Sequence, residues 1–209
     1  MPKHTLMINT SLLDGADMPK SWAELADPKW NGKIIVANPN NSYMGFTVSW
    51  GLWKALDEKT YKTIVSNLVV TESSSGVQKA VAMGEYAIGI GFEWNAYNYI
   101  AGGQDELKVV YPAEGTFLST EYAGLVKNAP AGDAAKKAID VLLSKDTQIE
   151  LLKVGFRRPS RSDINVTDYV QMPALDTIKT IPIDELAAAD AREGFLKEWD
   201  ALPKAGESK

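Results

Sequence analysis

Three consecutive serines, Ser73, Ser74 and Ser75, follow a short apolar run and precede a segment with apolar residues at helical spacing. Serine is favoured at the start of a helix, where its hydroxyl accepts a hydrogen bond from a backbone N–H group. The N–H groups of the first turn have no partner inside the helix, and the helix dipole adds partial positive charge there. These residues predict a binding place for an anion such as phosphate or carboxylate. Capping by one serine, with the other two solvated, also explains them.

Polar and aromatic side chains follow three other predicted strands at the corresponding point. The candidate ligand-contacting residues there are Asn41, Ser42, Glu93, Trp94, Tyr97 and Glu114. Their amide, hydroxyl and carboxylate groups suit phosphoryl oxygens, sugar hydroxyls or an amine, and an aromatic ring offers an apolar face. Each also has a structural explanation. The amide and hydroxyl cap a helix, Glu93 is stabilised by a helix dipole, Glu114 lies in a solvated turn, and the aromatic rings are partly buried.

Strands and helices alternate along the chain. Strands are predicted at 5–13, 34–37, 68–71, 86–92, 107–111 and 122–126, and helices at 43–56, after the serines up to Gly84, and at 93–100, 131–144, 146–155 and 182–202. This alternation predicts an α/β fold with a mostly parallel sheet and flanking helices. Ligands of such sheets bind beyond the carboxyl ends of the strands, where the candidate residues lie.

The composition excludes several classes of function. The chain has 209 residues, 45% of them hydrophobic, a net charge of −5 and a pI near 5.0, so it offers no basic surface for nucleic acid. No run of about 18 apolar residues predicts a membrane span. The first residues do not resemble a signal peptide, so the chain expressed as given is expected in the cytoplasm.

The sequence contains few of the residues that usually serve as nucleophiles or metal ligands. It contains no cysteine and a single histidine, His4, which we expect to be solvated near the start of the chain. A Ser-His-Asp triad or a multi-histidine metal site is therefore not expected. Arg157, Arg158 and Arg161 are predicted to form a solvated basic turn, although they also suit a phosphate. We expect a non-enzymatic protein without catalytic residues, metal or cofactor.

The segment at 19–34, PKSWAELADPKWNGKI, resembles a characteristic segment of the periplasmic substrate-binding proteins of ABC importers, in the ferric-iron, organophosphate and phosphonate branch. The similarity continues through the Ser-rich loop, the Gly84-Glu85 pair and residues 110–116, and then through Arg158-Pro159 and 161–163. It covers about residues 6–163.

This resemblance implies a periplasmic-binding-protein-like lobe. The family has two α/β lobes joined by hinge strands that close on the ligand. By this likeness residues 5–126 form the second, ligand-binding lobe, residues 127–203 are C-terminal helices that normally complete the largely missing first lobe, and residues 204–209 are a disordered tail. The strand at 122–126 would return to the first lobe. The resemblance also implies a periplasmic location and an ABC permease as partner.

The resemblance narrows the ligand without identifying it. Iron binders of this branch carry two adjacent tyrosines where this chain has Glu93 and Trp94, so a ferric-iron-binding protein is the less favoured alternative. A small anionic solute such as a sugar phosphate or a phosphonate fits the serines and carboxylates better. Hexose phosphates and aminoethylphosphonate are the family ligands that we consider.

Two alternatives belong to other classes of function. Glu93 and Glu114 could serve as the acid/base pair of a glycosidase-like enzyme, although no sequence signal sets their separation. Alternatively, the chain is an orphan lobe that acts as an interaction domain or homo-oligomer. In that case Phe195, Leu196 and Trp199 would be exposed on the surface that the missing lobe normally covers.

Overall fold

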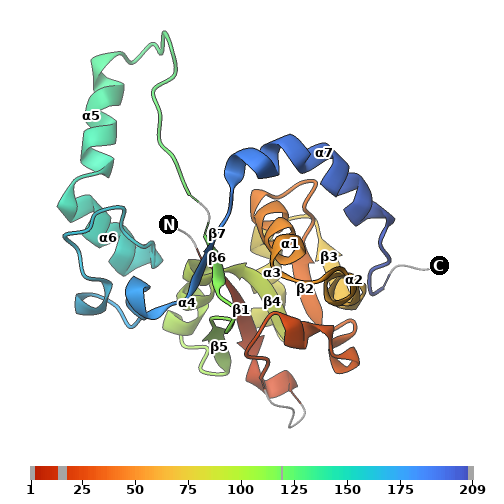
Figure 1. The fold of residues 1–209 in the computed structure, drawn as a ribbon. Coiled ribbons are helices and arrows are strands. Elements are labelled where there is room, and N and C mark those ends of the chain that lie inside the picture. Colours follow the sequence, from red (N-terminus) through yellow and green to blue (C-terminus); the bar gives the residue numbers. More distant parts are fainter. Residues whose placement is uncertain (1–2, 14–17, 119, 207–209) are drawn as a thin grey trace.

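The computed structural model describes residues 3–13, 18–118 and 120–206. Its centre is a sheet in the order β3-β2-β4-β1-β5 (Figure 1). The strands are β1 (His4–Asn9), β2 (Ile34–Ala37), β3 (Leu68–Thr71), β4 (Ile88–Phe92) and β5 (Leu107–Val110). β2 pairs in parallel with β3 and β4, whereas β1 pairs antiparallel with β4 and β5. The predicted α/β fold is therefore confirmed, but the sheet is mixed, with two parallel and two antiparallel pairings.

β1 is shorter than predicted and runs against its neighbours. It ends at Asn9, whose side chain accepts a hydrogen bond from Ser11 N at 3.1 Å and starts a 3₁₀ turn at Thr10–Leu12. The described residues between β1 and β2 form further 3₁₀ turns at Ala23–Ala26 and Pro28–Trp30. A parallel connection usually requires a crossover helix, and the described residues of this connection contain none.

Helices cover both faces of the sheet. α1 (Tyr43–Ala55) and α2 (Glu58–Asn67) pack on one face, and α3 (Ser74–Ala82) and α4 (Glu93–Ala101) pack on the other. Side chains of β1 alternate between the faces, as the pleat of a strand requires. Leu6 and Ile8 belong to the cluster with α1 and α2, and Met7 belongs to the cluster with α3 and α4. The two clusters fix the positions at which α1, α3 and α4 begin.

The close approach of α3 to β4 depends on Gly89. A Cβ atom at this position would lie 2.8 Å from Val81 Cγ2 and 3.1 Å from Val77 Cγ1. We expect Gly89→Ala to lower the free energy of unfolding, measured by urea denaturation, by about 1–3 kcal/mol because it overpacks this contact. The matched control is Gly194→Ala, since Gly194 is an exposed helical glycine without atoms within 4 Å. It should instead raise stability by up to about 1 kcal/mol. Equal effects of the two changes would contradict the packing of α3.

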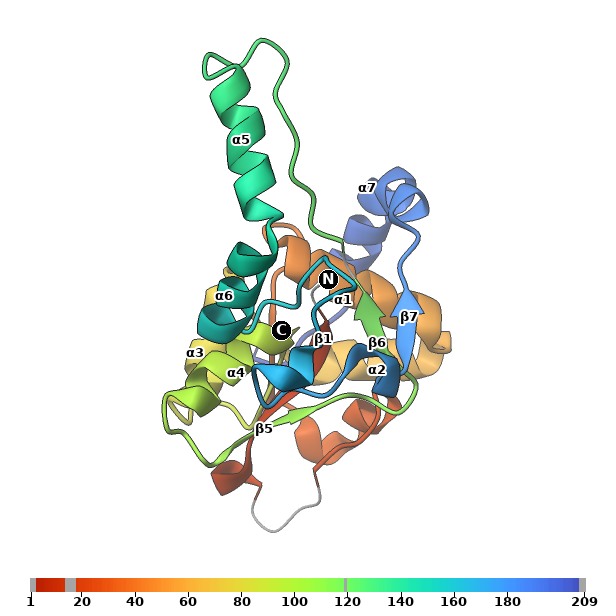
Figure 2. The same cartoon turned by 90° about the vertical axis from the view of Figure 1, so that its left-hand side faces the viewer.

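A second, two-stranded sheet consists of β6 (Thr116–Leu118) and β7 (Thr180–Pro182), which pair in parallel. Between them, residues 120–156 form what we call the arm, an extended segment followed by α5 (Asp133–Leu142) and α6 (Lys145–Gly155). Figures 1 and 2 show α5 standing away from the sheet. None of the residues of α5 is buried. The predicted helices therefore form, but the apolar face of α5 is uncovered.

The prediction of a strand at 122–126 is wrong for this structure. These residues are extended and exposed, with Tyr122 at 78% and Val126 at 77% exposure. A strand needs a neighbour to pair its backbone groups, and no strand in the described part of the chain lies beside this segment. The pairing partner expected from the resemblance would belong to the first lobe.

The last helix covers the lobe instead of presenting an apolar surface. α7 (Glu185–Ala201) lies within the predicted helix at 182–202. Phe195 and Trp199 are only 3% and 2% exposed, and Leu196 is half-buried. The ring of Phe195 meets that of Trp50 in α1 edge-on, with the centroids 5.5 Å apart. The expectation that these residues form an exposed partner surface is therefore wrong, because they complete the core over α1.

The chain after α7 is ordered further than predicted. Lys204 is buried, and its ammonium donates to the carbonyl oxygens of Trp199 and Leu202 at 2.7 Å each. Ala205 N donates to Leu68 O at 2.9 Å, which ties this segment to β3. The predicted disordered tail at 204–209 thus begins with anchored residues, and 207–209 lie outside the described residues.

Candidate functional site

Three helices begin at one edge of the sheet. Because β2, β3 and β4 are parallel, the starts of α1, α3 and α4 that follow them lie at the same edge. We call the residues at these starts, 38–42, 72–75 and 93–95, the functional edge. The first two starts are capped by serines, as the sequence predicts. Ser42 Oγ accepts from Gly45 N, and Ser73 Oγ accepts from Gly76 N, each at 3.1 Å.

Side chains join the first two loops of the functional edge. Glu72 accepts a hydrogen bond from Asn41 Nδ2 at 2.5 Å and one from Asn38 Nδ2 at 3.3 Å. Asn41, Ser73 and Ser75 are exposed, and Ser74 is half-buried. Within the described part of the chain, the Ser74 hydroxyl makes no side-chain hydrogen bond, whereas Ser73 is used in capping. The Ser74 hydroxyl is therefore available for a ligand, and so is that of Ser75, which is exposed and lies 3.4 Å from Ser73 Oγ.

Glu93 is the centre of a buried ionic network. Its side chain is 1% exposed and that of Arg158 is 3% exposed. Arg158 Nε donates to Glu93 Oε1 at 2.6 Å and Arg158 Nη2 to Glu93 Oε2 at 3.1 Å. Tyr111 donates its hydroxyl to Glu93 Oε2 at 2.6 Å, and Tyr97 Oη lies 3.4 Å from Tyr111 Oη. Both oxygens of Glu93 are thus used within the protein.

Burial and charge set the protonation states in this network. Burial raises the pKa of Tyr97 and Tyr111, so both phenols are neutral at ordinary pH. Burial alone would disfavour the charged form of Arg158, but its hydrogen bonds to Glu93 hold the pKa of the guanidinium above its usual value. The network is therefore a charged pair with a neutral phenol as an additional donor.

The expectation of a solvated basic turn is wrong for Arg158. Arg158 is the buried partner of Glu93 and also donates from Nη1 to Pro173 O at 2.9 Å. The Arg157 guanidinium lies 3.6 Å from the ring centroid of Trp94 and pairs with Glu121 at 3.2 Å. The side chains of Arg157 and Arg161 are exposed to a similar extent, 37% and 39%, and Arg161 pairs locally with Asp163. The sequence shows three adjacent cations, but long-range partners decide which of them is buried.

Two predicted site residues have structural partners. Glu114 accepts hydrogen bonds from the backbone N–H groups of Trp22 and Ala23, each at 2.9 Å, and so caps the 3₁₀ turn Ala23–Ala26. The Tyr97 ring stacks against Phe156 of the arm at 5.7 Å between centroids. Glu93 and Glu114 are the two carboxylates of the alternative acid/base pair. Each of them is instead hydrogen-bonded to a different segment of the protein.

The structure brings one further residue to the functional edge that the sequence analysis missed. Gln78 follows Ser74 by four residues on α3, so both lie on the same face of the helix. Its side chain is fully buried, and Oε1 accepts a hydrogen bond from Asn95 Nδ2 in α4 at 3.1 Å. Gly91 makes room for it, because a Cβ there would collide with Gln78 Nε2. The sequence could have indicated Gln78, because residues four apart in a helix lie on the same face and Gln78 follows Ser74 by four.

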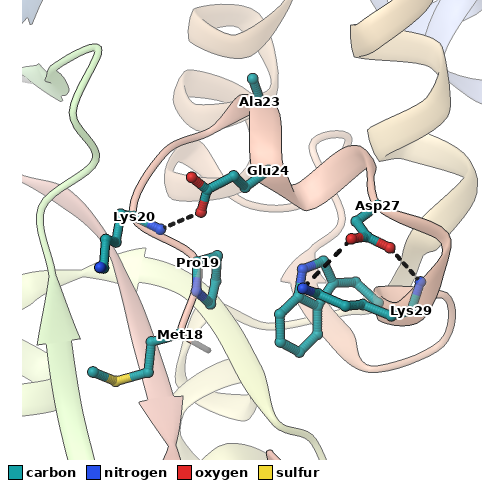
Figure 3. Close-up of a pocket in the computed structure, with 8 residues that line it drawn as sticks. Met18, Pro19, Lys20, Ala23, Glu24, Asp27 and Lys29 are labelled. Atoms are coloured by element: carbon teal, nitrogen blue, oxygen red, sulfur yellow. Dashed lines mark hydrogen bonds and ion pairs between the residues drawn. The ribbon is translucent and has the colours of Figure 1, made fainter. Parts of the chain in front are cut away.

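A pocket of about 360 Å³ lies elsewhere, between residues 18–20 and the 3₁₀ turns (Figure 3). Both carboxylates of its wall have partners there, because Glu24 accepts a hydrogen bond from the backbone Lys20 N at 2.7 Å and Asp27 pairs with Lys29 at 3.4 Å. None of the predicted site residues lines this pocket. The candidate site is therefore the functional edge.

Comparison with known proteins places the chain in a family. The family model described as bacterial extracellular solute-binding protein matches residues 1–188. An "Uncharacterized protein" of Haemophilus influenzae is 28% identical over 195 residues, which are 88% of this chain and 55% of the relative. The Salmonella typhi protein named "Putative 2-aminoethylphosphonate-binding periplasmic protein" is 28% identical over 176 residues, 78% of this chain and 51% of the relative.

A solved structure agrees with these matches. The periplasmic binding protein AfuA of Actinobacillus pleuropneumoniae, with fructose 6-phosphate bound, superposes with a TM-score of 0.79 at 28% identity, covering 96% of this chain and 66% of AfuA. The chain spans about half the length of the curated relatives it matches. No helix in the described residues combines the length and apolar character needed to cross a membrane. The family match and the shared fold confirm the resemblance drawn from the sequence, and the chain belongs to the bacterial extracellular solute-binding proteins.

Proposed function

We propose that this chain is the ligand-contacting lobe of the solute-binding component of an ABC importer. In this role it binds a small anionic solute at the functional edge, without catalysis, and delivers it to a permease. Membership of the family supports the role, and the relatives named as periplasmic support the same compartment. A homo-oligomer is not part of the proposal, because Phe195 and Trp199 of α7, which were expected at its interface, are buried in the core of the lobe.

The proposed solute carries a phosphoryl or phosphonyl group. One relative is named for 2-aminoethylphosphonate and the AfuA structure holds fructose 6-phosphate, and both molecules carry a tetrahedral phosphorus oxyanion on a small carbon skeleton. Such a group accepts several hydrogen bonds and favours the amino end of a helix dipole. Sugar phosphates and phosphonates are therefore the class that we propose for this chain.

The observation that carries the proposal is the arrangement at the start of α3. Ser73 caps the helix, which leaves the hydroxyl of Ser74 without a side-chain partner among the described residues and that of Ser75 exposed. Gln78 extends the same face of α3 toward α4, with a buried amide nitrogen that makes no hydrogen bond in the described structure. A tetrahedral oxyanion provides the acceptors that these donors need.

Titration calorimetry tests the proposal. Fructose 6-phosphate and 2-aminoethylphosphonate should bind with about millimolar affinity, because a single lobe contacts and desolvates only part of the solute. Fructose should not bind. Ser74→Ala should weaken binding about tenfold through loss of a hydrogen bond to a charged group. Ser162→Ala, which changes an exposed serine outside the functional edge, should have no effect. Absence of heat with both anionic solutes would contradict the proposed ligand class for this chain.

A further inference from the structure

Three buried nitrogen donors without partners belong to residues at or beside the first turn of α4. Among the described residues, Lys3 Nζ, Gln78 Nε2 and Trp94 Nε1 are buried and make no hydrogen bond. Lys3 lies beside this turn because its carbonyl oxygen accepts from Glu93 N at 2.9 Å. Gln78 is held there by its hydrogen bond to Asn95, and Trp94 belongs to the turn itself. A buried donor without an acceptor costs about 1–3 kcal/mol, so several in one place indicate a missing acceptor.

The start of α4 lacks the cap that the other helices of the functional edge have. Its N-cap residue is Phe92, which has no side-chain hydrogen bond to offer, whereas Ser42 and Ser73 cap α1 and α3. Glu93 N donates to the Lys3 carbonyl oxygen, and the remaining first-turn N–H groups and the positive end of the dipole add to the three unpartnered donors. The carboxylate of Glu93 accepts hydrogen bonds from Arg158 and Tyr111 but none from the three buried donors.

The buried charges at this place do not balance. Lys3 and Arg158 are cationic, and Glu93 is the only anion that acts on Lys3 in the described structure. Lys3 is 0% exposed. Burial lowers the pKa of Lys3 to about 8, while the charge of Glu93 opposes this fall, so the ammonium is still the main form at pH 7. One positive charge is therefore left over in a buried position, where an unpaired charge is costly.

We infer that Lys3, Gln78 and Trp94 form an oxyanion subsite at the start of α4, which receives the charged group of the solute. This inference rests on the proposed function and deepens it, because it identifies the residue that neutralises the solute's charge. Ser74 and Gln78 lie four residues apart on one face of α3. The subsite is therefore next to the Ser-rich loop and more deeply buried than this loop. Since Lys3 is 0% exposed, binding of the group requires that the residues packed over Lys3 move.

The first test measures binding to Lys3 variants. With 2-aminoethylphosphonate as probe, Lys3→Met should weaken binding at least tenfold, and Lys3→Arg should retain more of it, since both cations can bind an oxyanion. The matched control is Lys59→Met, which removes the same charge from an exposed position on α2. Without ligand, Lys3→Met should melt at a higher temperature than wild type, because it removes an unpaired buried charge. A folded Lys3→Met protein with wild-type affinity would overturn the inference.

A second measurement separates this inference from the proposed function. The Lys3 side-chain NMR resonance, assigned through its absence from Lys3→Met, is followed during titration with inorganic phosphate. A saturable shift of this resonance, reduced in Gln78→Ala, supports the subsite even if neither organic solute binds. If 2-aminoethylphosphonate binds and Ser74→Ala weakens it while the Lys3 resonance does not respond, the proposed function stands and the subsite is wrong. An unresponsive Lys3 with all probes also contradicts the subsite.

Discussion

Glu93→Ala is expected to lower the free energy of unfolding by about 3–5 kcal/mol, which is the usual cost of removing one partner of a buried ion pair. The change leaves Arg158 and Lys3, two buried cations, without the carboxylate that offsets them. It also leaves the Tyr111 hydroxyl without its acceptor. Urea denaturation at pH 7 measures the effect as a lower midpoint at an unchanged slope.

The reverse truncation distinguishes this network from an isolated pair. Arg158→Met leaves Glu93 with Lys3 as a remaining counter-charge, so it should cost less than Glu93→Ala. In an isolated pair the two truncations should cost similar amounts. The surface control is Glu150→Ala, which breaks an exposed pair with Lys153 at 3.1 Å and should cost less than about 1 kcal/mol. Comparable costs for Glu93→Ala and Glu150→Ala would show that the Glu93 network does not contribute as the structure indicates.

His4 is expected to make the protein lose about 3 kcal/mol of stability between pH 6.5 and pH 4. The ring is fully buried, Nδ1 lies 3.2 Å from Phe117 O, and Nε2 lies 2.8 Å from Thr47 Oγ1. Because the carbonyl oxygen can only accept, Nδ1 carries the proton and Nε2 accepts from the threonine hydroxyl. Burial lowers the pKa of His4 from 6.5 to about 4, although hydrogen bonds to backbone groups oppose this.

The sign of the effect follows from which state takes up the proton first. Below pH 6.5 the unfolded chain binds a proton at His4 while the folded protein does not, so stability falls as the pH is lowered. The loss ends near pH 4, where the folded protein also becomes protonated, and one pKa unit corresponds to about 1.4 kcal/mol. Three exposed carboxylates also have lowered pKa values, namely Asp27, Asp57 and Asp163. The stability that they contribute is lost at a lower pH than that of His4.

Urea denaturation at a series of pH values measures this dependence. His4 is the only histidine in the sequence, so the slope between pH 6.5 and pH 4 has one main source. His4→Gln should abolish most of this slope, whatever its stability at pH 7. A wild-type protein that is equally stable at pH 6.5 and pH 4.5 would contradict the buried neutral histidine.

The sequence predicted the parts of the fold that depend on local signals. Serine before an amphipathic segment marked the starts of α1 and α3, because a cap interacts with its own first turn. Alternation of strands and helices predicted the parallel core of the sheet. The direction of β1 was not predicted, since it depends on the connection to β2. The strand at 122–126 failed because strand formation requires a partner, which propensity does not supply.

The features of the candidate site also fall into those that the sequence predicts and those that depend on the tertiary structure. The sequence alone determined the family, the α/β fold and the helix starts that carry Ser42 and Ser73, because these are encoded within a few consecutive residues. Only the tertiary structure decided the environments of Glu93 and His4, since their partners lie 65 and 113 residues away in the chain. Residue type gives the possible chemistry of a side chain, whereas its burial, charge and free hydrogen-bonding capacity depend on which distant segments the fold places against it.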